Sequence, residues 1–253
     1  MPNIYETERL LAEYLLFHYG GVGDVFTGPW EPPQGMREAL HFPERTVNAC
    51  FDFEALPPGA HALDVGCAVG RAAFELARHC GSVTAIDFSR RFIEAANILK
   101  RDGALPFARI DEGARTIPCT ACVPRDIPRD RVSFETGDAM DLRAGIGPFD
   151  AVLAANLLCR LPDPAKFLAR LPALVKPGGQ LVITTPCTWL EEFTPRANWL
   201  CGESSSTLDG LHRHLDPYFN IVKQTGLPFV IREHARKFQW TMAQATLWRR
   251  RHD

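Results

Sequence analysis

The sequence contains little that would direct the protein to a membrane or to nucleic acid. No apolar run approaches the roughly 20 residues that span a bilayer, and Met1 to Glu8 are too polar for a signal peptide. The 28 lysines and arginines are balanced by 30 acidic residues, which gives a formal charge of −2. Because nucleic-acid binding usually requires a basic face, we expect a cytoplasmic protein whose partners are small molecules, with no nucleic acid and no membrane.

The sequence also lacks the cysteine pattern of a disulfide framework or a structural zinc site. Eight cysteines are spread over 253 residues, and without a secretory signal we expect them to be reduced thiols. Cys119 and Cys122 form a C-x-x-C pair, but no second pair lies at a spacing that would complete four zinc ligands. We therefore predict that no metal is bound.

One turn carries the strongest functional signal. An apolar run ends at Asp64, and the chain then turns through Gly66 and Gly70 into a helical pattern. Glycine permits φ > 0 and has no Cβ to block a ligand, and a helix N-terminus presents free N–H groups. A second apolar run ends at Asp87, where a carboxylate can accept hydrogen bonds from ribose hydroxyls. The arrangement resembles the S-adenosylmethionine (SAM) site of class I methyltransferases.

A nicotinamide or flavin dinucleotide site is the nearest alternative for this turn. Its fingerprint is G-x-G-x-x-G, whereas this chain has Ala68 at the middle glycine and an arginine at position 71. SAM has no pyrophosphate to cradle, and Asp64 is well placed to receive the cationic amino group of its methionyl part. A purely structural strand–turn–helix corner is the remaining interpretation.

Residues after the third and fourth predicted strands complete the expected cofactor site. Asp138 can accept a hydrogen bond from the adenine amine, and Asn156 should face the sulfonium, because ligands bind outside the carboxyl ends of parallel strands. Asp138 could instead belong to a polar loop before a helix, and Asn156 could only cap the turn that follows it. The residues expected to contact SAM are Asp64, Gly66, Cys67, Ala68, Gly70, Asp87, Phe88, Asp138, Ala139, Met140, Asn156 and Leu157.

The alternation of strand and helix patterns predicts a Rossmann-like α/β fold with parallel βαβ units. We expect a seven-stranded, mostly parallel sheet with an antiparallel last strand and helices on both faces. Residues 1–58 should form an N-terminal helical lid and loop, and residues 59–253 the SAM-binding core. Residues 101–131 are too long for an ordinary connection and are expected to be a surface excursion. The predicted strands are 61–65, 82–87, 132–136, 151–155 and 180–184, followed by an antiparallel pair at 229–232 and 243–248.

Several strings outside the glycine turn resemble the methyltransferase of ovothiol biosynthesis. They extend almost from one end of the chain to the other, and the last is polar, aromatic and long, which no generic core motif explains. The matching strings are Tyr5-Glu-Thr-Glu8, Glu13-Tyr-Leu-Leu-Phe-His-Tyr-Gly20, Leu40-His-Phe-Pro43, Thr188-Trp-Leu-Glu-Glu-Phe-Thr-Pro195, Asn198-Trp199 and Pro228-Phe-Val-Ile-Arg-Glu-His-Ala-Arg-Lys-Phe-Gln-Trp240.

The resemblance implies N-methylation of the imidazole of 5-thiohistidine (4-mercaptohistidine) to give ovothiol. In that family the methyltransferase is usually the C-terminal domain of a larger iron enzyme. This sequence shows no sulfoxide-synthase region, so we expect a separate sulfoxide synthase to supply the substrate. Two alternatives stay open: methylation of another small heteroaromatic or carboxylate metabolite, and a non-catalytic SAM-binding module.

The last string supplies the expected catalytic group. His234 is the first choice for a base or a ring-orienting group, with Asn156 beside the methyl group, and Arg236 is expected to hold the substrate carboxylate. Either arginine of the string could instead form a salt bridge on a solvated hairpin. His18 and Tyr19 could belong to a lid, or their helix could simply pack on the sheet. The expected substrate-binding residues are His18, Tyr19, Thr185, Trp189, Arg232 and Arg236.

Overall fold

The computed structural model describes residues 4–252 and contains one seven-stranded sheet and one two-stranded sheet. The order in the larger sheet is β5-β2-β1-β6-β7-β9-β8. Its first four pairings are parallel, and β9 pairs antiparallel with both β7 and β8, so the predicted fold is confirmed. The strands are β1 His61–Val65, β2 Ser82–Asp87, β5 Val132–Thr136, β6 Phe149–Ala155, β7 Val175–Thr185, β8 Phe219–His234 and β9 Lys237–Arg250.

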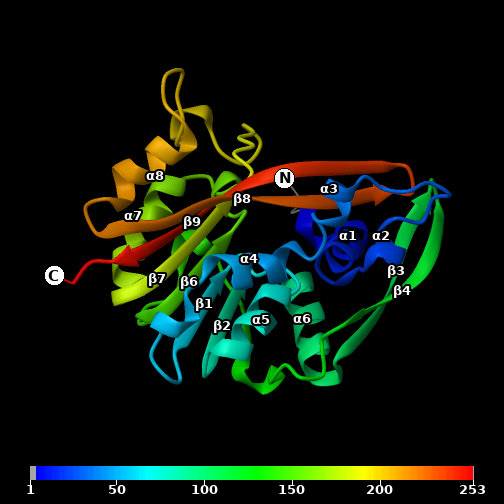
Figure 1. The fold of residues 1–253 in the computed structure, drawn as a ribbon, viewed down its shortest axis with the longest axis horizontal. Coiled ribbons are helices and arrows are strands. Elements are labelled where there is room, and N and C mark those ends of the chain that lie inside the picture. Colours follow the sequence, from blue (N-terminus) through cyan, green and yellow to red (C-terminus); the bar gives the residue numbers. More distant parts are fainter. Residues whose placement is uncertain (1–3, 253) are drawn as a thin grey trace.

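Helices cover both faces of this sheet (Figure 1). Side chains of successive strand residues point to opposite faces, and the two faces form separate cores. Ala62 and Val182 pack with α4, α5 and α6, whereas their neighbours Leu63 and Leu181 pack with α7 and α8. The helices are α1 Glu8–Tyr19, α2 Val22–Val25, α3 Gln34–Arg37, α4 Phe42–Cys50, α5 Arg71–His79, α6 Arg90–Asp102, α7 Pro164–Leu174 and α8 Thr207–Leu215.

The excursion between α6 and β5 is a β-hairpin. Strands β3 (Ala104–Glu112) and β4 (Arg115–Cys122) pair antiparallel and form the two-stranded sheet. Cys119 and Cys122 lie three residues apart on β4, so their side chains point to opposite faces of the hairpin. The sequence pattern did not predict these strands because each contains a proline, a residue that usually argues against a strand.

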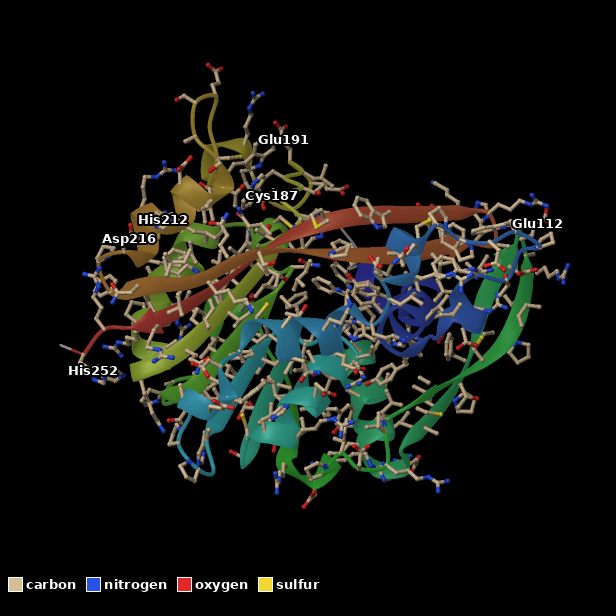
Figure 2. All side chains as sticks on the ribbon, in the orientation of Figure 1. Glu112, Cys187, Glu191, His212, Asp216 and His252 are labelled. Carbon is tan, nitrogen blue, oxygen red and sulfur yellow. The ribbon has the colours of Figure 1, made fainter. Side chains whose placement is uncertain are left out.

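A second long hairpin, formed by β8 and β9, extends past the edge of the main sheet toward α1, α3 and the first hairpin (Figure 1). Its turn contacts β3: the Ala235 N–H donates to the Asp111 carbonyl at 2.9 Å. Figure 2 shows Glu112, at the tip of the β3–β4 hairpin, at the same end of the molecule. The expected antiparallel pair is therefore present, but it is much longer than the two predicted runs.

Helices α1 to α4 precede β1, and α1 packs against β3 and β8. The division of the chain into 1–58 and 59–253 stays a prediction. Within residues 4–252 no helix is both long enough and apolar enough to cross a membrane.

Candidate active site

The turn between β1 and α5 depends on two glycines. Gly66 and Gly70 have φ of +77° and +86°, a region that L side chains rarely adopt. A Cβ on Gly70 would lie 2.6 Å from Cζ of Phe134. The Tyr19 hydroxyl donates to the Val69 carbonyl at 2.8 Å and so holds the turn from the side of α1.

This turn borders a cavity of about 400 Å³ at the carboxyl ends of the parallel strands. Of the residues expected to contact SAM, all except Gly70 line it; Gly70 instead precedes the first residue of α5. The other walls come from the N-terminal helices, the segment after β6 and strand β8. These additional lining residues include Tyr5, Tyr14, Phe17, His18, Phe42, Phe92, Arg160, Pro186, Phe229 and Ile231.

Asp64 is the most buried carboxylate of the cavity wall. It is 1% exposed, and its Oδ2 atom has no hydrogen-bond partner in the described part of the chain. Burial, together with the nearby carboxylate of Asp87, raises the pKa of Asp64 to about 8. An unpartnered buried carboxyl oxygen is costly, and the ammonium of a methionyl group would provide the missing partner.

Asp87 is held rigidly at the end of β2. Its Oδ2 accepts from the Ala68 N–H and its Oδ1 from the Ser89 N–H, each at 2.8 Å. Burial raises the pKa of Asp87, and these two backbone donors partly oppose that rise. Each carboxylate oxygen has a second lone pair, so the carboxylate can still accept from two vicinal hydroxyls such as those of a ribose.

The part of the cavity lined by Asp138 and Ala139 has the character of an adenine site. Oδ1 of Asp138 accepts from the Met140 N–H at 2.8 Å, which fixes the carboxylate beside the buried methyl group of Ala139. Phe88 lines the cavity and is 62% exposed. Such an exposed aromatic ring offers a flat apolar face at the entrance.

Asn156 faces the cavity from a strained backbone position. Its φ is +52°, and its N–H donates to the Thr184 carbonyl at 2.8 Å. Its Oδ1 accepts from the Thr184 hydroxyl at 3.0 Å, so the amide NH2 remains the group that can donate to a ligand. Leu157, which also lines the cavity, lies 3.0 Å from the position of a Cβ on Gly66.

His18 belongs to the aromatic wall that α1 contributes. The side chain is 6% exposed, and Nδ1 has no partner among the described residues. Burial, and secondarily the charge of Arg71, lowers the pKa of His18 to about 3. The imidazole is therefore neutral at physiological pH and lines the cavity beside Tyr14 and Phe17.

Arg160 is a site residue that the sequence interpretation missed. It ends a 3₁₀ turn (Leu158–Arg160) directly after Asn156 and lines the cavity. Its guanidinium lies 4.5 Å from the centre of the Phe193 ring. The only available signal was its position four residues after Asn156, on a turn that follows a parallel strand.

A family model described as a methyltransferase domain matches residues 36–243, most of the chain. The chain belongs to this methyltransferase family. It is 27% identical over 208 residues to the methyltransferase GfsG of Streptomyces halstedii, and this match covers 81% of the chain and 66% of that protein. A match to the O-methyltransferase cnsE of Penicillium expansum has 29% identity over 162 residues and covers 64% of the chain and 50% of cnsE.

A solved SAM-dependent methyltransferase of Methanosarcina mazei has the same fold, with a TM-score of 0.53 and 19% identity. The match covers 79% of this chain and 96% of that one. The chain thus spans between half and just under two thirds of the lengths of the two curated relatives. SAM is the cofactor that the cavity fits. Asp64 matches its ammonium group, Asp87 matches its ribose hydroxyls and Asp138 matches its adenine amine.

Three residues expected at the substrate site do not line the methyltransferase cavity. Arg232 is buried away from it: its Nη1 donates to the Ile110 carbonyl at 2.6 Å and its Nη2 pairs with Asp111 at 3.3 Å. His234 and Arg236 lie at the β8–β9 turn, where the Arg236 N–H donates to Nδ1 of His234 at 3.3 Å. Strand β8 continues so far past the sheet edge that its end reaches β3.

Three further expected residues have structural contacts and also do not line the cavity. The Trp189 indole N–H donates to the Thr207 hydroxyl at 2.9 Å. The Thr185 hydroxyl accepts from the Cys187 N–H at 3.1 Å, at the end of β7, where Figure 2 labels Cys187. Tyr19 supports the glycine turn, as described above. Of the expected substrate residues, His18 alone lines the cavity.

No group of three or more histidine, cysteine or acidic side chains within residues 4–252 is arranged to hold a metal ion. The expectation that the protein binds no metal stays a prediction.

Proposed function

We propose that the protein transfers the methyl group of SAM to an imidazole nitrogen of 5-thiohistidine. The sequence resemblance supports this substrate, because its strings supply part of the cavity wall: Tyr5 and His18 come from the first two, and Phe229 and Ile231 come from the last. A flat, polar-edged ring suits a wall of aromatic side chains that contains a few unpaired polar atoms.

The observation that carries the proposal is the neutral His18 in that aromatic wall. Its ring centre lies 5.3 Å from that of Phe17 and 5.9 Å from that of Tyr14. With a pKa of about 3, His18 can accept a hydrogen bond at neutral pH without taking a proton. It can therefore hold one N–H of a substrate imidazole, which leaves the opposite ring nitrogen free to react.

When bound, SAM supplies an electrophilic methyl group that an unprotonated ring nitrogen can take by in-line displacement. The chain has to align that nitrogen and exclude water. The substrate sulfur is the softer nucleophile, so it has to be held out of line. The free NH2 of Asn156 is suited to donate a hydrogen bond to that thiolate.

The test is to incubate the purified protein with SAM and 5-thiohistidine and to look for a gain of one methyl group by mass spectrometry. Fragmentation then distinguishes N-methylation from S-methylation. We expect N-methylated product, and a strongly reduced rate for His18→Phe, which keeps an aromatic ring but has no acceptor. S-methylation as the main product would contradict the proposed selectivity.

O-methylation of another small metabolite is the second candidate, and the O-methyltransferase cnsE relative favours it. A neutral acceptor such as His18 could equally hold a hydroxyl group. Methylation of a phenol or a carboxylate from a panel of such compounds, together with no methylation of 5-thiohistidine, would favour this alternative. Binding of S-adenosylhomocysteine without any turnover would instead indicate a non-catalytic module.

A further inference from the structure

The cavity wall contains an arginine that has no counter-ion. Arg160 lines the cavity, its Nη1 is buried without a hydrogen-bond partner, and no carboxylate within residues 4–252 forms an ion pair with it. The Phe193 ring under its guanidinium attracts the cation and fixes its plane, but it does not neutralise the charge. An unpaired, partly buried cation is unfavourable unless a ligand supplies an anion.

Two arginines that are more deeply buried than Arg160 are paired within the chain, which sets Arg160 apart. Arg71 pairs with Glu75 at 2.8 Å and also with Glu44. Arg232 pairs with Asp111. Both of these therefore have a sufficient structural explanation within the chain, and Arg160 does not.

We propose, building on the function proposed above, that Arg160 binds the carboxylate of the substrate. The substrate class is then an imidazole-bearing amino acid rather than the corresponding amine. The planar guanidinium can meet a carboxylate through two parallel hydrogen bonds. Tyr5 and Tyr14 line the cavity together with Arg160, whose charge partly opposes the rise in the pKa of both hydroxyls that burial causes. His18, which neighbours Tyr14, then meets the ring of the same molecule.

The carboxylate of the cofactor is the other anion that could reach this arginine. Its amino and carboxyl groups are carried by one carbon atom, so a cofactor held by Asp64 keeps its carboxylate close to Asp64. Asp64 and Arg160 line the same cavity, so the experiment has to distinguish the carboxylate of the substrate from that of the cofactor.

The experiment compares Arg160→Met and Arg160→Lys with the wild type on two compounds, 5-thiohistidine and the same ring compound without a carboxylate, 5-thiohistamine. We expect Arg160→Met to raise KM for 5-thiohistidine by about 10- to 100-fold, the loss expected for a charge-assisted hydrogen bond. The KM for 5-thiohistamine should not change. Arg160→Lys should recover part of this loss in KM. For both variants, calorimetry should give an affinity for S-adenosylhomocysteine within about twofold of the wild type.

Arg196→Met is the matched control, because Arg196 also lies over an aromatic ring, that of Trp199, but does not line the cavity. It should leave both KM values unchanged. An equal loss for the two compounds in Arg160→Met would overturn the proposal. Weaker S-adenosylhomocysteine binding would overturn it too, by assigning Arg160 to the cofactor carboxylate.

If the wild type methylates neither compound, the proposed function fails and a binding experiment decides the role of Arg160. Calorimetry on the protein saturated with S-adenosylhomocysteine would compare histidine with histamine. A preference for histidine that Arg160→Met abolishes supports the carboxylate anchor. No preference in the wild type overturns it.

Discussion

Asp64 and Arg232 are both buried ionisable side chains, 1% and 4% exposed, yet their surroundings differ in kind. Asp64 lies at the carboxyl end of β1 with one oxygen that no described residue satisfies. Arg232 lies near the end of β8, and both of its terminal nitrogens are bonded to β3. The first is suited to a ligand, and the second joins two hairpins.

The comparison shows that one motif can contribute both to the cavity wall, through Phe229 and Ile231, and to contacts between hairpins. The string around Arg232 is long and polar, which suggested substrate contacts. The same polarity is explained by hairpin contacts: Asp111 pairs with Arg232 and Arg109, and Glu233 pairs with Lys237. Asp64, His18 and Arg160 line the cavity instead, and each has a buried polar atom without a partner among the described residues.

Removing the Asp64 carboxylate should have the largest effect. We expect Asp64→Ala to weaken S-adenosylhomocysteine binding by about 3–5 kcal/mol, because the buried ammonium of the ligand would have no counter-ion. Calorimetry measures this loss. The unfolding free energy of the ligand-free variant should not fall correspondingly, since the carboxylate has no partner there; a large fall would make Asp64 a structural residue and remove the contrast with Arg232.

Arg232→Met should show the opposite pattern. We expect it to lower the unfolding free energy by about 2–4 kcal/mol, because Asp111 and the Ile110 carbonyl lose charge-assisted hydrogen bonds. Urea denaturation measures this change, with the exposed Arg236→Met as the control. S-adenosylhomocysteine affinity should stay within about twofold. A selective loss of substrate affinity in a stably folded variant would return Arg232 to the active site.

The raised pKa of Asp64 predicts a pH dependence of cofactor binding. Below a pKa of about 8 the ligand-free carboxyl is protonated, and it has to ionise to meet an ammonium. Affinity for S-adenosylhomocysteine should therefore rise between pH 6 and pH 8, by at most about tenfold per pH unit. Because the folded state holds this proton more tightly than the unfolded chain, the stability of the ligand-free protein should fall as the pH rises from about 4 to about 8.

Calorimetry in buffers of different ionisation enthalpy should detect the proton released on binding. The matched control is Asp64→Asn, which has no ionisable group at this position. A pH dependence that persists in Asp64→Asn would show that another group is responsible.

The smallest effect is expected at the β8–β9 turn. His234→Ala and Arg236→Ala should leave kcat and KM within about twofold of the wild type, because neither residue lines the cavity. Steady-state kinetics with the active substrate checks this. A fall in kcat of about a hundredfold for His234→Ala, the usual effect of losing a positioned acid–base group, would place the turn in the active site after all.

Much of the cofactor half could be predicted from the sequence because its signals are local. The β1–turn–α5 unit depends on an apolar run, two glycines and a helix pattern that are adjacent in the chain, and β1, β2 and β5 have the predicted bounds. The strand-end acids follow from the rule that parallel strands present their carboxyl ends at one edge. The β3–β4 hairpin could not be predicted in this way, since Pro106 and Pro118 interrupt its strand patterns.

Only the tertiary structure decided which polar side chains are left without partners. Nη1 of Arg232 donates to a carbonyl 122 residues away in the sequence, and His18 is a buried residue of α1, which packs against β3 and β8. Nη1 of Arg160 has no partner among the described residues, although Arg160 follows a strand that was correctly predicted. The sequence by itself determined the sheet and the acids at its edge, because these depend on neighbouring residues. Whether a buried charge has a partner depends on contacts between distant segments, which form only when the chain has folded.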